Sequence, residues 1–310
     1  MERRVLISTS FFGDANAAPL VRLESAGLVV VPNPFGRRLT RQEVTELLAD
    51  ERVQGVIAGL EPLDRGVLAS SSLRVVSRVG SGVSNVDLDA ASELGIAVRS
   101  TPASPTAAVA ELTVGAMISL LRMIPVMDRA LRERRWEKRL GGQIEGRTVA
   151  IIGFGRIGRR VSELLAPFRP SIVVVDPYVP AEEVAPLPQV SLDEAIAVAD
   201  IVTIHSSGEE LLFGPDEIPR MRSGAYLLNA ARGGLVDEAA LVAALCEGHL
   251  TGAWLDALPQ EPYDGPLCDL PNVILTPHVG SYTTECRVKM EMEAVENLLD
   301  SLDEAERAAS

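Results

Sequence analysis

The run Gly-Phe-Gly-Arg-Ile-Gly at residues 153–158 is the segment whose residue types and spacing indicate the most specific chemistry. It directly follows an apolar stretch with the pattern of a strand, and it opens a stretch with the apolar spacing of an amphipathic helix. Gly153 permits a tight turn, Gly155 lets the backbone approach a pyrophosphate, and Gly158 lets the helix pack closely against the strand. The helix N-terminus would offer unpaired N–H groups to the phosphates. We therefore expect a dinucleotide-binding loop, and its cofactor-binding residues are expected to be Gly153, Gly155, Arg156, Ile157 and Gly158.

An acidic residue follows at the distance that this interpretation requires. Asp176 ends the next apolar run, at the place where a ribose 2′-hydroxyl needs an acceptor about 20 residues beyond the glycines. A carboxylate there repels a 2′-phosphate, which favours NAD over NADP as the cofactor. Asp176 could instead only begin the turn before Pro177. The succession of strand, glycine loop, helix, strand and acid favours the cofactor site over that alternative.

Three later segments place polar or charged side chains directly after expected strands, and they contain Arg232, Glu261 and His278. In an open parallel sheet, ligands bind at the edge formed by the carboxyl ends of the strands. Each residue also has a plainer interpretation: a surface turn for the arginine, an exposed loop carboxylate for the glutamate and a strand cap for the histidine. Their joint occurrence in this order, on a nucleotide-binding scaffold, favours a ligand site.

Short expected strands alternate with helical patterns along most of the chain. The 310 residues are 47% hydrophobic and only 4% aromatic, which suits buried parallel strands between helices. The chain length suits two domains rather than one core. The strands are expected at residues 4–8, 28–31, 54–58, 74–77, 96–99, 148–152, 172–175, 201–204, 225–228, 252–255 and 273–275.

These patterns predict an α/β fold with two doubly wound parallel-sheet domains and a cleft between them. A flavodoxin-like substrate-binding and catalytic domain is expected from residues 1–100 and 284–310, and a Rossmann NAD-binding domain from residues 101–283. The helical stretch 105–121 is apolar on all faces, so we expect it to be buried against another domain or subunit. Glutamates interrupt the arginine-rich run 129–139, which we therefore expect to be a solvated surface.

Charge and cysteine usage exclude several classes of function. The formal net charge of −14 disfavours nucleic acid and anionic membranes as partners, although local cations can still bind a small anionic substrate. The three cysteines form no C-x-x-C pair, which argues against a disulfide framework and a structural zinc site, and no metal is expected. The N-terminus lacks the features of a signal peptide, and no apolar run is long enough to cross a membrane. A cytoplasmic protein is expected.

Taken together, the segments resemble the D-isomer-specific 2-hydroxyacid dehydrogenase family. The resemblance rests on the glycine loop, the three later segments and the run Arg-Val-Gly-Ser-Gly-Val-Ser-Asn-Val-Asp at residues 78–87, and it extends from roughly Arg74 to Tyr282. The family includes phosphoglycerate, glycerate, D-lactate, formate and phosphite dehydrogenases. The first seventy residues match only in pattern, and in the family this region helps to determine the substrate.

The resemblance implies a catalytic role for each of three residues. Arg232 matches the arginine that binds the substrate carboxylate and polarises the carbonyl, because a guanidinium fork fits a planar carboxylate. His278 matches the acid/base, which takes the hydroxyl proton during oxidation and returns it during reduction. Glu261 matches the carboxylate that orients this histidine. The implied reaction is hydride transfer between C4 of the nicotinamide of NAD and C2 of a small D-2-hydroxy acid or 2-oxo acid.

The remaining expected contacts lie on both sides of the substrate. The backbone amides of Ser81, Gly82 and Val83 resemble the rest of the family's carboxylate cradle. Asp256 is expected on the cofactor side. The helix around 105–121 resembles the family's dimerisation helix, so a homodimer is expected.

One segment departs from the family. The family usually carries a proline-, leucine- and threonine-rich segment where this chain has residues 205–213, so the cofactor contacts there are unassigned.

Two alternative functions remain open. The phosphite branch makes a phosphonate- or phosphite-type substrate an alternative. Arg78 and Arg99 are the candidate cations for such a substrate, although both could be solvated strand-end residues. A second alternative is an NAD(H)-sensing binding protein, because some relatives are corepressors, but no basic patch supports it.

Overall fold

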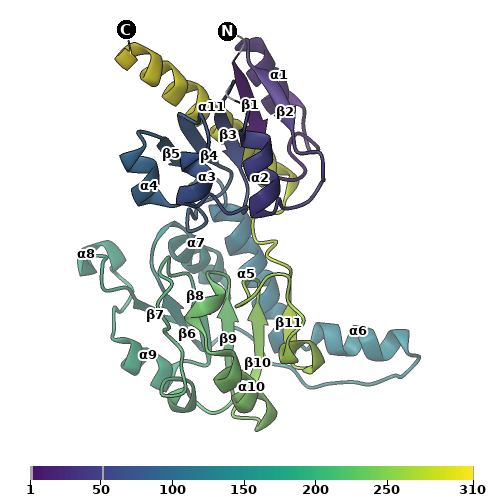
Figure 1. Cartoon of the computed structure of the whole chain (residues 1–310). Coiled ribbons are helices and arrows are strands. Elements are labelled where there is room, and N and C mark those ends of the chain that lie inside the picture. The colour runs from purple at the N-terminus through teal and green to yellow at the C-terminus, as the bar shows by residue number, and fades with distance from the viewer. Residues whose placement is uncertain (1–2, 51, 310) are drawn as a thin grey trace. The chain divides into compact units, whose positions relative to one another are not determined.

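The computed structural model describes residues 3–50 and 52–309, which form two compact units (Figure 1). Unit 1 comprises Met1–Pro105 and Ser281–Ser310, and unit 2 comprises Thr106–Gly280. The unit boundaries therefore lie a few residues from those expected from the sequence. Each unit contains one parallel sheet, so the predicted fold class is confirmed.

Unit 1 is built on a five-stranded parallel sheet with the strand order β2-β1-β3-β4-β5. This is the flavodoxin-like order, in which the direction of winding changes between β1 and β3. The strands are β1 (Arg4–Ile7), β2 (Val29–Pro32), β3 (Val53–Ala58), β4 (Val75–Arg78) and β5 (Ala97–Ser100). The helices are α1 (Ala18–Ser25), α2 (Arg41–Leu48), α3 (Arg65–Ala69), α4 (Leu88–Glu93) and α11 (Thr284–Ala309).

The C-terminal helix α11 completes unit 1 by packing along β3, β4 and β5 beside α1 (Figure 1). The hydroxyl of Ser77 in β4 donates to the carbonyl of Ala294 at 2.7 Å. A Cβ at Gly55 in β3 would lie 2.9 Å from Leu298, so glycine allows this close approach. The last segment of the chain is thus part of the core of unit 1.

Unit 2 is built on a six-stranded parallel sheet with the order β11-β10-β9-β8-β6-β7. A single bridge between Val174 and Gln189 continues the sheet beyond β7. The strands are β6 (Thr148–Ile152), β7 (Ser171–Val175), β8 (Ile201–Ile204), β9 (Ala225–Asn229), β10 (Leu250–Leu255) and β11 (Val273–Leu275). The α-helices are α5 (Thr106–Leu121), α6 (Ile124–Arg132), α7 (Arg156–Leu165), α8 (Ala181–Val184), α9 (Leu192–Val198) and α10 (Glu238–Cys246). Short 3₁₀ helices occur at Ala166–Phe168, Ile218–Arg220, Gly233–Leu235 and Pro266–Asp269.

Both faces of the unit 2 sheet are covered, as the apolar strands predict. Alternate residues of β6 point into different cores: Ala150 into a cluster with α9 and α10, and Ile151 into a cluster with α5 and α7. The apolar helix α5 lies mainly against α7 and β10 within the unit. The helix is therefore buried largely against the core of its own unit rather than against another domain as expected, and its contact with a second subunit stays a prediction.

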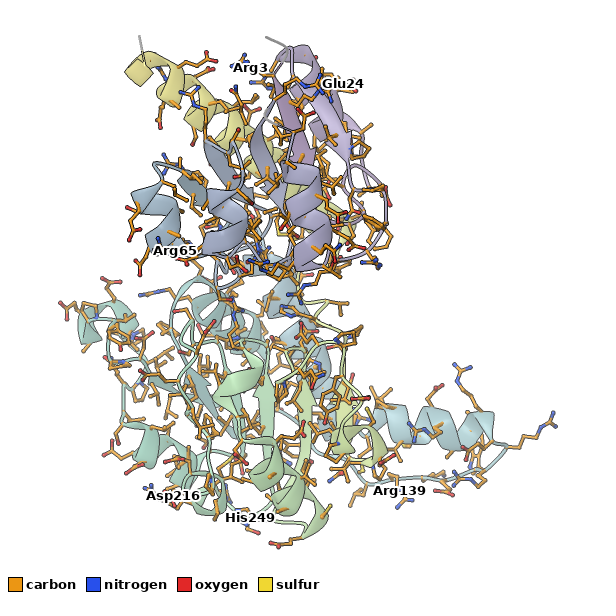
Figure 2. All side chains as sticks on the ribbon, viewed as in Figure 1. Arg3, Glu24, Arg65, Arg139, Asp216 and His249 are labelled. Carbon is orange, nitrogen blue, oxygen red and sulfur yellow. The ribbon has the colours of Figure 1, made fainter. Side chains whose placement is uncertain are left out.

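The segment from Ile124 to Leu140, which we call the projecting arm, extends away from the sheet of unit 2 (Figure 1). It consists of α6 and an irregular stretch that includes Arg139, labelled in Figure 2. Exposed ion pairs join its charged residues, such as Arg132 to Asp128 at 2.7 Å. The arginine-rich run is thus mostly exposed in the single chain, as expected, although the regular helix ends before most of it.

Two tests for other classes of protein are negative within residues 3–50 and 52–309. No single helix there is long and apolar enough to cross a membrane, and only the bent pair of α5 and α6 passes by length and composition. Nor do those residues contain a group of three or more His, Cys, Asp or Glu side chains that could hold a metal ion.

Candidate active site

The glycine loop joins β6 to α7, and its first and third glycines are required by the surrounding backbone. Gly153 has a φ of +94°, and a Cβ there would lie 2.7 Å from the backbone of His205. A Cβ at Gly158 would lie 2.1 Å from the carbonyl oxygen of Gly153. A Cβ at Gly155, in contrast, would meet no protein atom within 4 Å. The second glycine therefore faces open space, as close approach of a pyrophosphate requires.

The polar groups around this loop fit a dinucleotide. The carboxylate of Asp176, after β7, accepts the N–H of Phe154 at 2.7 Å and that of Tyr178 at 3.0 Å. Each of its oxygens keeps acceptor capacity for a ribose hydroxyl. Arg156 is exposed at the start of α7 and has no ion-pair partner among the described residues, so its charge is available to a phosphate. Ile157 instead packs against the core.

His278 and Glu261 form the central pair of the site. The Nδ1 atom of His278 lies 3.0 Å from both carboxylate oxygens of Glu261. With Nδ1–H donated to the carboxylate, Nε2 is the nitrogen that can exchange a proton with a ligand. The imidazole is partly exposed, at 38%, so a ligand can reach it. This arrangement is that of an oriented acid/base.

The loop that carries His278 is held in an unusual backbone conformation by Asp256. His278 has a φ of +54°, which is uncommon for a residue other than glycine and costs of order 1 kcal/mol. Asp256 is only 3% exposed, and its carboxylate accepts the N–H groups of Val279 at 2.9 Å and Gly280 at 2.8 Å. Thr276 donates its hydroxyl to the same carboxylate at 2.6 Å. Asp256 therefore supports the histidine loop, and its expected contact with the cofactor remains a prediction.

Arg232 lies in a turn whose conformation is fixed by other residues and not by the side chain of Arg232. The buried Asn229 donates to the carbonyl of Arg232 at 2.8 Å and accepts the N–H of Ala231 at 3.0 Å. A Cβ at Gly233 would lie 2.1 Å from the backbone of Leu258, so this turn packs directly against the segment that leads to Glu261. The guanidinium itself donates to the carbonyl of Ala231 at 2.8 Å, which leaves most of its five donors for a ligand.

Strand order brings the three catalytic candidates to one edge of the sheet. Arg232 follows β9, Glu261 follows β10 and His278 follows β11, and these strands are consecutive neighbours. The glycine loop follows β6 at the carboxyl edge of the same sheet. Unit 2 thus presents the glycine loop, the hydrogen-bonded pair of His278 and Glu261, and the guanidinium of Arg232 along one edge.

The expected carboxylate cradle lies in unit 1, directly after β4. The backbone N–H groups of Ser81, Gly82 and Val83 have no hydrogen-bond partner in the part of the chain that the structure describes. They are therefore available as donors. Of the two other cations considered from the sequence, Arg78 lies against Gly80 beside this cradle, whereas Arg99 pairs with Glu304 at 3.3 Å.

The atypical segment 205–213 lies beside the chain that follows Arg232. The N–H groups of Leu212 and Phe213 both donate to the carbonyl of Leu235. Burial lowers the pKa of His205 to about 3, so this histidine stays neutral near pH 7. Its Nε2 atom lies 2.9 Å from the hydroxyl of Thr203.

Sequence reasoning missed the supporting residues of the site. Neither the anchoring of the histidine loop by Asp256, nor the turn-fixing role of Asn229, nor the close packing at Gly233 was expected. The only available signal was that polar or small residues stand directly after predicted strands. That signal marks the ligand edge but does not distinguish a residue that contacts ligand from one that holds a loop.

Comparison with known proteins identifies the class. A family model described as the NAD binding domain of D-isomer specific 2-hydroxyacid dehydrogenases matches residues 114–280. The chain is 38% identical over 259 residues to a D-3-phosphoglycerate dehydrogenase of Methanocaldococcus jannaschii, covering 80% of this chain and 49% of that relative. The solved TT0316 protein from Thermus thermophilus is 35% identical with a TM-score of 0.88 and covers 97% of each chain. A glyoxylate reductase from Paecilomyes thermophila is 28% identical with a TM-score of 0.87, covering 98% of this chain and 96% of the other.

The chain belongs to the D-isomer specific 2-hydroxyacid dehydrogenase family and carries its NAD-binding domain. The resemblance found in the motifs is thereby confirmed. The chain spans about half the length of the curated relatives it matches.

The open space at Gly155 leads to a prediction about cofactor affinity. Gly155→Ala should fold with an unchanged melting temperature, because the new methyl group meets no protein atom within 4 Å. It should nevertheless raise the dissociation constant of NADH by about tenfold or more, since the methyl group occupies the approach of the pyrophosphate. Fluorescence titration with NADH measures this effect.

Gly115→Ala in α5 is the matched control, because a Cβ there also meets nothing within 4 Å. This variant should bind NADH normally and gain about 0.5–1 kcal/mol of stability from helix propensity. Equal NADH affinity in the two variants would contradict the assignment of the loop.

Proposed function

We propose that this chain is an NAD-dependent oxidoreductase that transfers a hydride between nicotinamide C4 and C2 of a small D-2-hydroxy acid or 2-oxo acid. The observation that carries the proposal is the pair of His278 and Glu261, 3.0 Å apart at the sheet edge that also holds the glycine loop and Arg232. A nicotinamide dinucleotide bound at that edge supplies the hydride-transfer chemistry. The protein must then bind the substrate, orient it and move one proton.

Each catalytic side chain has one task in this reaction. Arg232 binds the substrate carboxylate through paired N–H donors, and the backbone amides of Ser81, Gly82 and Val83 supply further donors to the same group. In the direction of reduction, His278 donates the proton on Nε2 to the carbonyl oxygen as that oxygen gains negative charge. Glu261 keeps the ring oriented and stabilises its protonated form. In oxidation the same nitrogen accepts the hydroxyl proton.

The cofactor is proposed to be NAD rather than NADP because of Asp176. Its carboxylate is fixed by two backbone N–H groups at 2.7 and 3.0 Å, and it cannot turn away from the ribose without losing both. A 2′-phosphate would approach this fixed negative charge, whereas a 2′-hydroxyl would donate to it. Comparison of NADH and NADPH as reductants tests this preference.

The experiment that tests the function is consumption of NADH at 340 nm with a panel of 2-oxo acids, with NADPH and phosphonate analogues included. Rapid oxidation of NADH with at least one 2-oxo acid is expected. Activity only with the phosphorus compounds would establish the phosphonate-type alternative instead. Tight NADH binding without turnover of any panel member would contradict an enzymatic role and favour cofactor sensing.

We further propose that the chain forms a homodimer in which the projecting arm docks on a second copy. The arm exposes large apolar side chains: Trp136 is 78% and Leu140 is 97% exposed, and Ile124 and Leu131 are also exposed. Burial of such side chains against a partner is favourable, at about 25 cal/mol per Å² of apolar surface. A dimer contact through the preceding helix α5 stays a prediction, and the arm adjoins the C-terminal end of that helix.

A double variant of the arm tests this assembly. Leu131→Glu combined with Leu140→Glu should convert the dimer to a monomer, because two carboxylates would have to be desolvated at the interface. Light scattering coupled to size-exclusion chromatography measures the mass. Leu211→Glu is the control, since Leu211 is also well exposed but lies outside the arm. A wild-type chain that is monomeric at micromolar concentration would refute the proposal.

A further inference from the structure

A carboxyl group is buried at the switch point of the unit 1 sheet, between the ends of β1 and β3. Glu61 is fully buried, three residues after the end of β3. In a sheet of this order, the gap between the loops after β1 and β3 is the place where a ligand enters. Neither the acid/base pair nor the carboxylate cradle uses this residue. Its position therefore bears on what the first unit can accept.

The hydrogen-bond donors at this switch point are taken by Glu61 itself. The N–H of Gly59 lies 3.0 and 3.1 Å from the two carboxyl oxygens. The hydroxyl of Ser8, directly after β1, makes a short hydrogen bond to one of them. Backbone N–H and hydroxyl groups at strand ends are the donors with which α/β proteins bind phosphate. Here these donors are already taken by an internal carboxyl group.

No cation of the two loops compensates for this group. Residues 8–13 and 59–63 contain no lysine or arginine, and Glu61 has no ion-pair partner among the described residues. The large side chains that these loops expose are Phe11 and Leu60, which are 57% and 39% exposed. The loops thus expose apolar and uncharged side chains around Glu61, whose carboxyl group is hydrogen bonded within the protein.

The nearest cations of the adjoining loops are already placed elsewhere. Arg78 belongs to β4, and its guanidinium lies against Gly80 beside the cradle, where it suits the carboxylate end of a substrate. Arg38 lines a hollow together with Asp64 and Asp87, and Asp64 is also paired with Arg41 at 2.5 Å. Arg287, which donates to the carbonyl of Ser10 at 3.5 Å, is paired with Glu291 at 2.7 Å.

The cradle and the switch point are joined, so one small molecule can touch both. Asn85, in the loop that carries the cradle, donates its side-chain amide to the carbonyls of Glu61 at 2.7 Å and Gly59 at 3.3 Å. The N–H of Leu63 donates back to the carbonyl of Asn85 at 2.8 Å. The loop that carries the cradle is therefore tied directly to the loop that carries Leu60 and Glu61.

We propose that the substrate of this chain carries an uncharged group beyond C2, and that Glu61 and Leu60 exclude a phosphorylated one. This inference rests on the proposed oxidoreductase function. It predicts a substrate that differs from the phosphorylated one in the name of the D-3-phosphoglycerate dehydrogenase relatives. A dianionic phosphate at the loop of Leu60 would find an apolar side chain, backbone donors already taken by an internal carboxyl group, and no lysine or arginine in residues 8–13 and 59–63, so its desolvation would be poorly compensated.

The test uses two substrates that differ only in the phosphate: hydroxypyruvate and its 3-phosphate, each with NADH. In the wild-type protein, kcat/KM for hydroxypyruvate should exceed that for the 3-phosphate by about tenfold or more. Glu61→Gln keeps the size of the side chain and replaces the carboxyl group by an amide, and Leu60→Arg adds a cation on an exposed site. Both variants should lower the ratio of the two kcat/KM values by several-fold.

Leu94→Arg is the matched control, because Leu94 is 46% exposed but follows α4 at the opposite edge of the sheet. The ratio of its kcat/KM values for hydroxypyruvate and the 3-phosphate should equal that of the wild type. A wild-type protein that reduces the 3-phosphate as well as hydroxypyruvate would overturn this inference and leave the oxidoreductase function intact. An unchanged ratio in folded Leu60→Arg protein would also overturn it. Reduction of neither compound, nor of any other 2-oxo acid, would contradict the function itself and the inference with it.

Discussion

Replacement of His278 by glutamine is expected to reduce kcat for 2-oxo acid reduction by about 10²–10⁴, the usual contribution of a positioned acid/base. Glutamine can still hydrogen bond to Glu261, but it cannot donate a proton to an alkoxide at neutral pH. The NADH dissociation constant should change by less than about twofold, because proton transfer and cofactor binding use different groups. Stopped-flow kinetics and fluorescence titration measure the two quantities separately.

A second variant of His278 separates loss of the proton donor from a change in backbone conformation. Its φ of +54° lies in the left-handed region, which asparagine adopts more readily than most residues. His278→Asn should therefore keep or improve the conformation of the loop and still lose activity to the same extent as the glutamine variant. His249→Gln, elsewhere in unit 2, is the control and should be fully active. Substantial turnover by either His278 variant would rule out this residue as the acid/base.

Glu261→Gln should have a smaller effect than loss of the histidine. The amide can still orient the ring at Nδ1, where the two carboxylate oxygens now lie at 3.0 Å, but it does not stabilise the protonated imidazole. We expect kcat to fall by about tenfold to a hundredfold. A fall in NADH affinity instead of kcat would assign the glutamate to the cofactor site.

The fold could be predicted from the sequence because its strands are buried on both faces. Strands such as Val149 to Ile152 are continuous apolar runs between helical patterns, and each predicted strand lies within two residues of an observed one. The glycine loop could also be predicted, because the local geometry requires glycine at Gly153 and Gly158. Local pattern and tertiary structure agree at these positions.

The supports of the site could not be predicted because they depend on contacts between distant segments. Asp256 and the N–H of Gly280 lie 24 positions apart in the sequence, and nothing local to either residue indicates that they hydrogen bond. The same holds for Ser8 and Glu61, which are separated by 53 positions. A buried carboxyl group without a nearby cation has no sequence signature, because its donors are backbone N–H and hydroxyl groups.

Replacement of Arg232 by alanine should lower kcat/KM for 2-oxo acids by about 10²–10³, consistent with about 2–5 kcal/mol for removing one partner of a buried, hydrogen-bonded charge pair. Lysine should not restore the activity, because a single ammonium group cannot make the paired contacts of the guanidinium fork with a carboxylate. The turn should survive both substitutions, since the side-chain amide of Asn229 fixes it through hydrogen bonds to main-chain groups at 2.8 and 3.0 Å. Melting temperature and NADH affinity should therefore stay unchanged while KM rises.

Guanidinium rescue distinguishes a lost substrate contact from a structural defect in that variant. Millimolar guanidinium should partly restore the activity of Arg232→Ala, because the free cation can occupy the vacated space and bind the substrate carboxylate. It should not restore His278→Asn, whose defect is the missing proton donor. Arg222→Ala is the control, since Arg222 forms an exposed ion pair with Asp200 at 2.5 Å and lies away from the ligand edge. Loss of folding in Arg232→Ala would show that Arg232 supports the structure of unit 2 rather than the substrate, and loss of activity in Arg222→Ala would show that the effect of removing an arginine is not specific to the ligand edge.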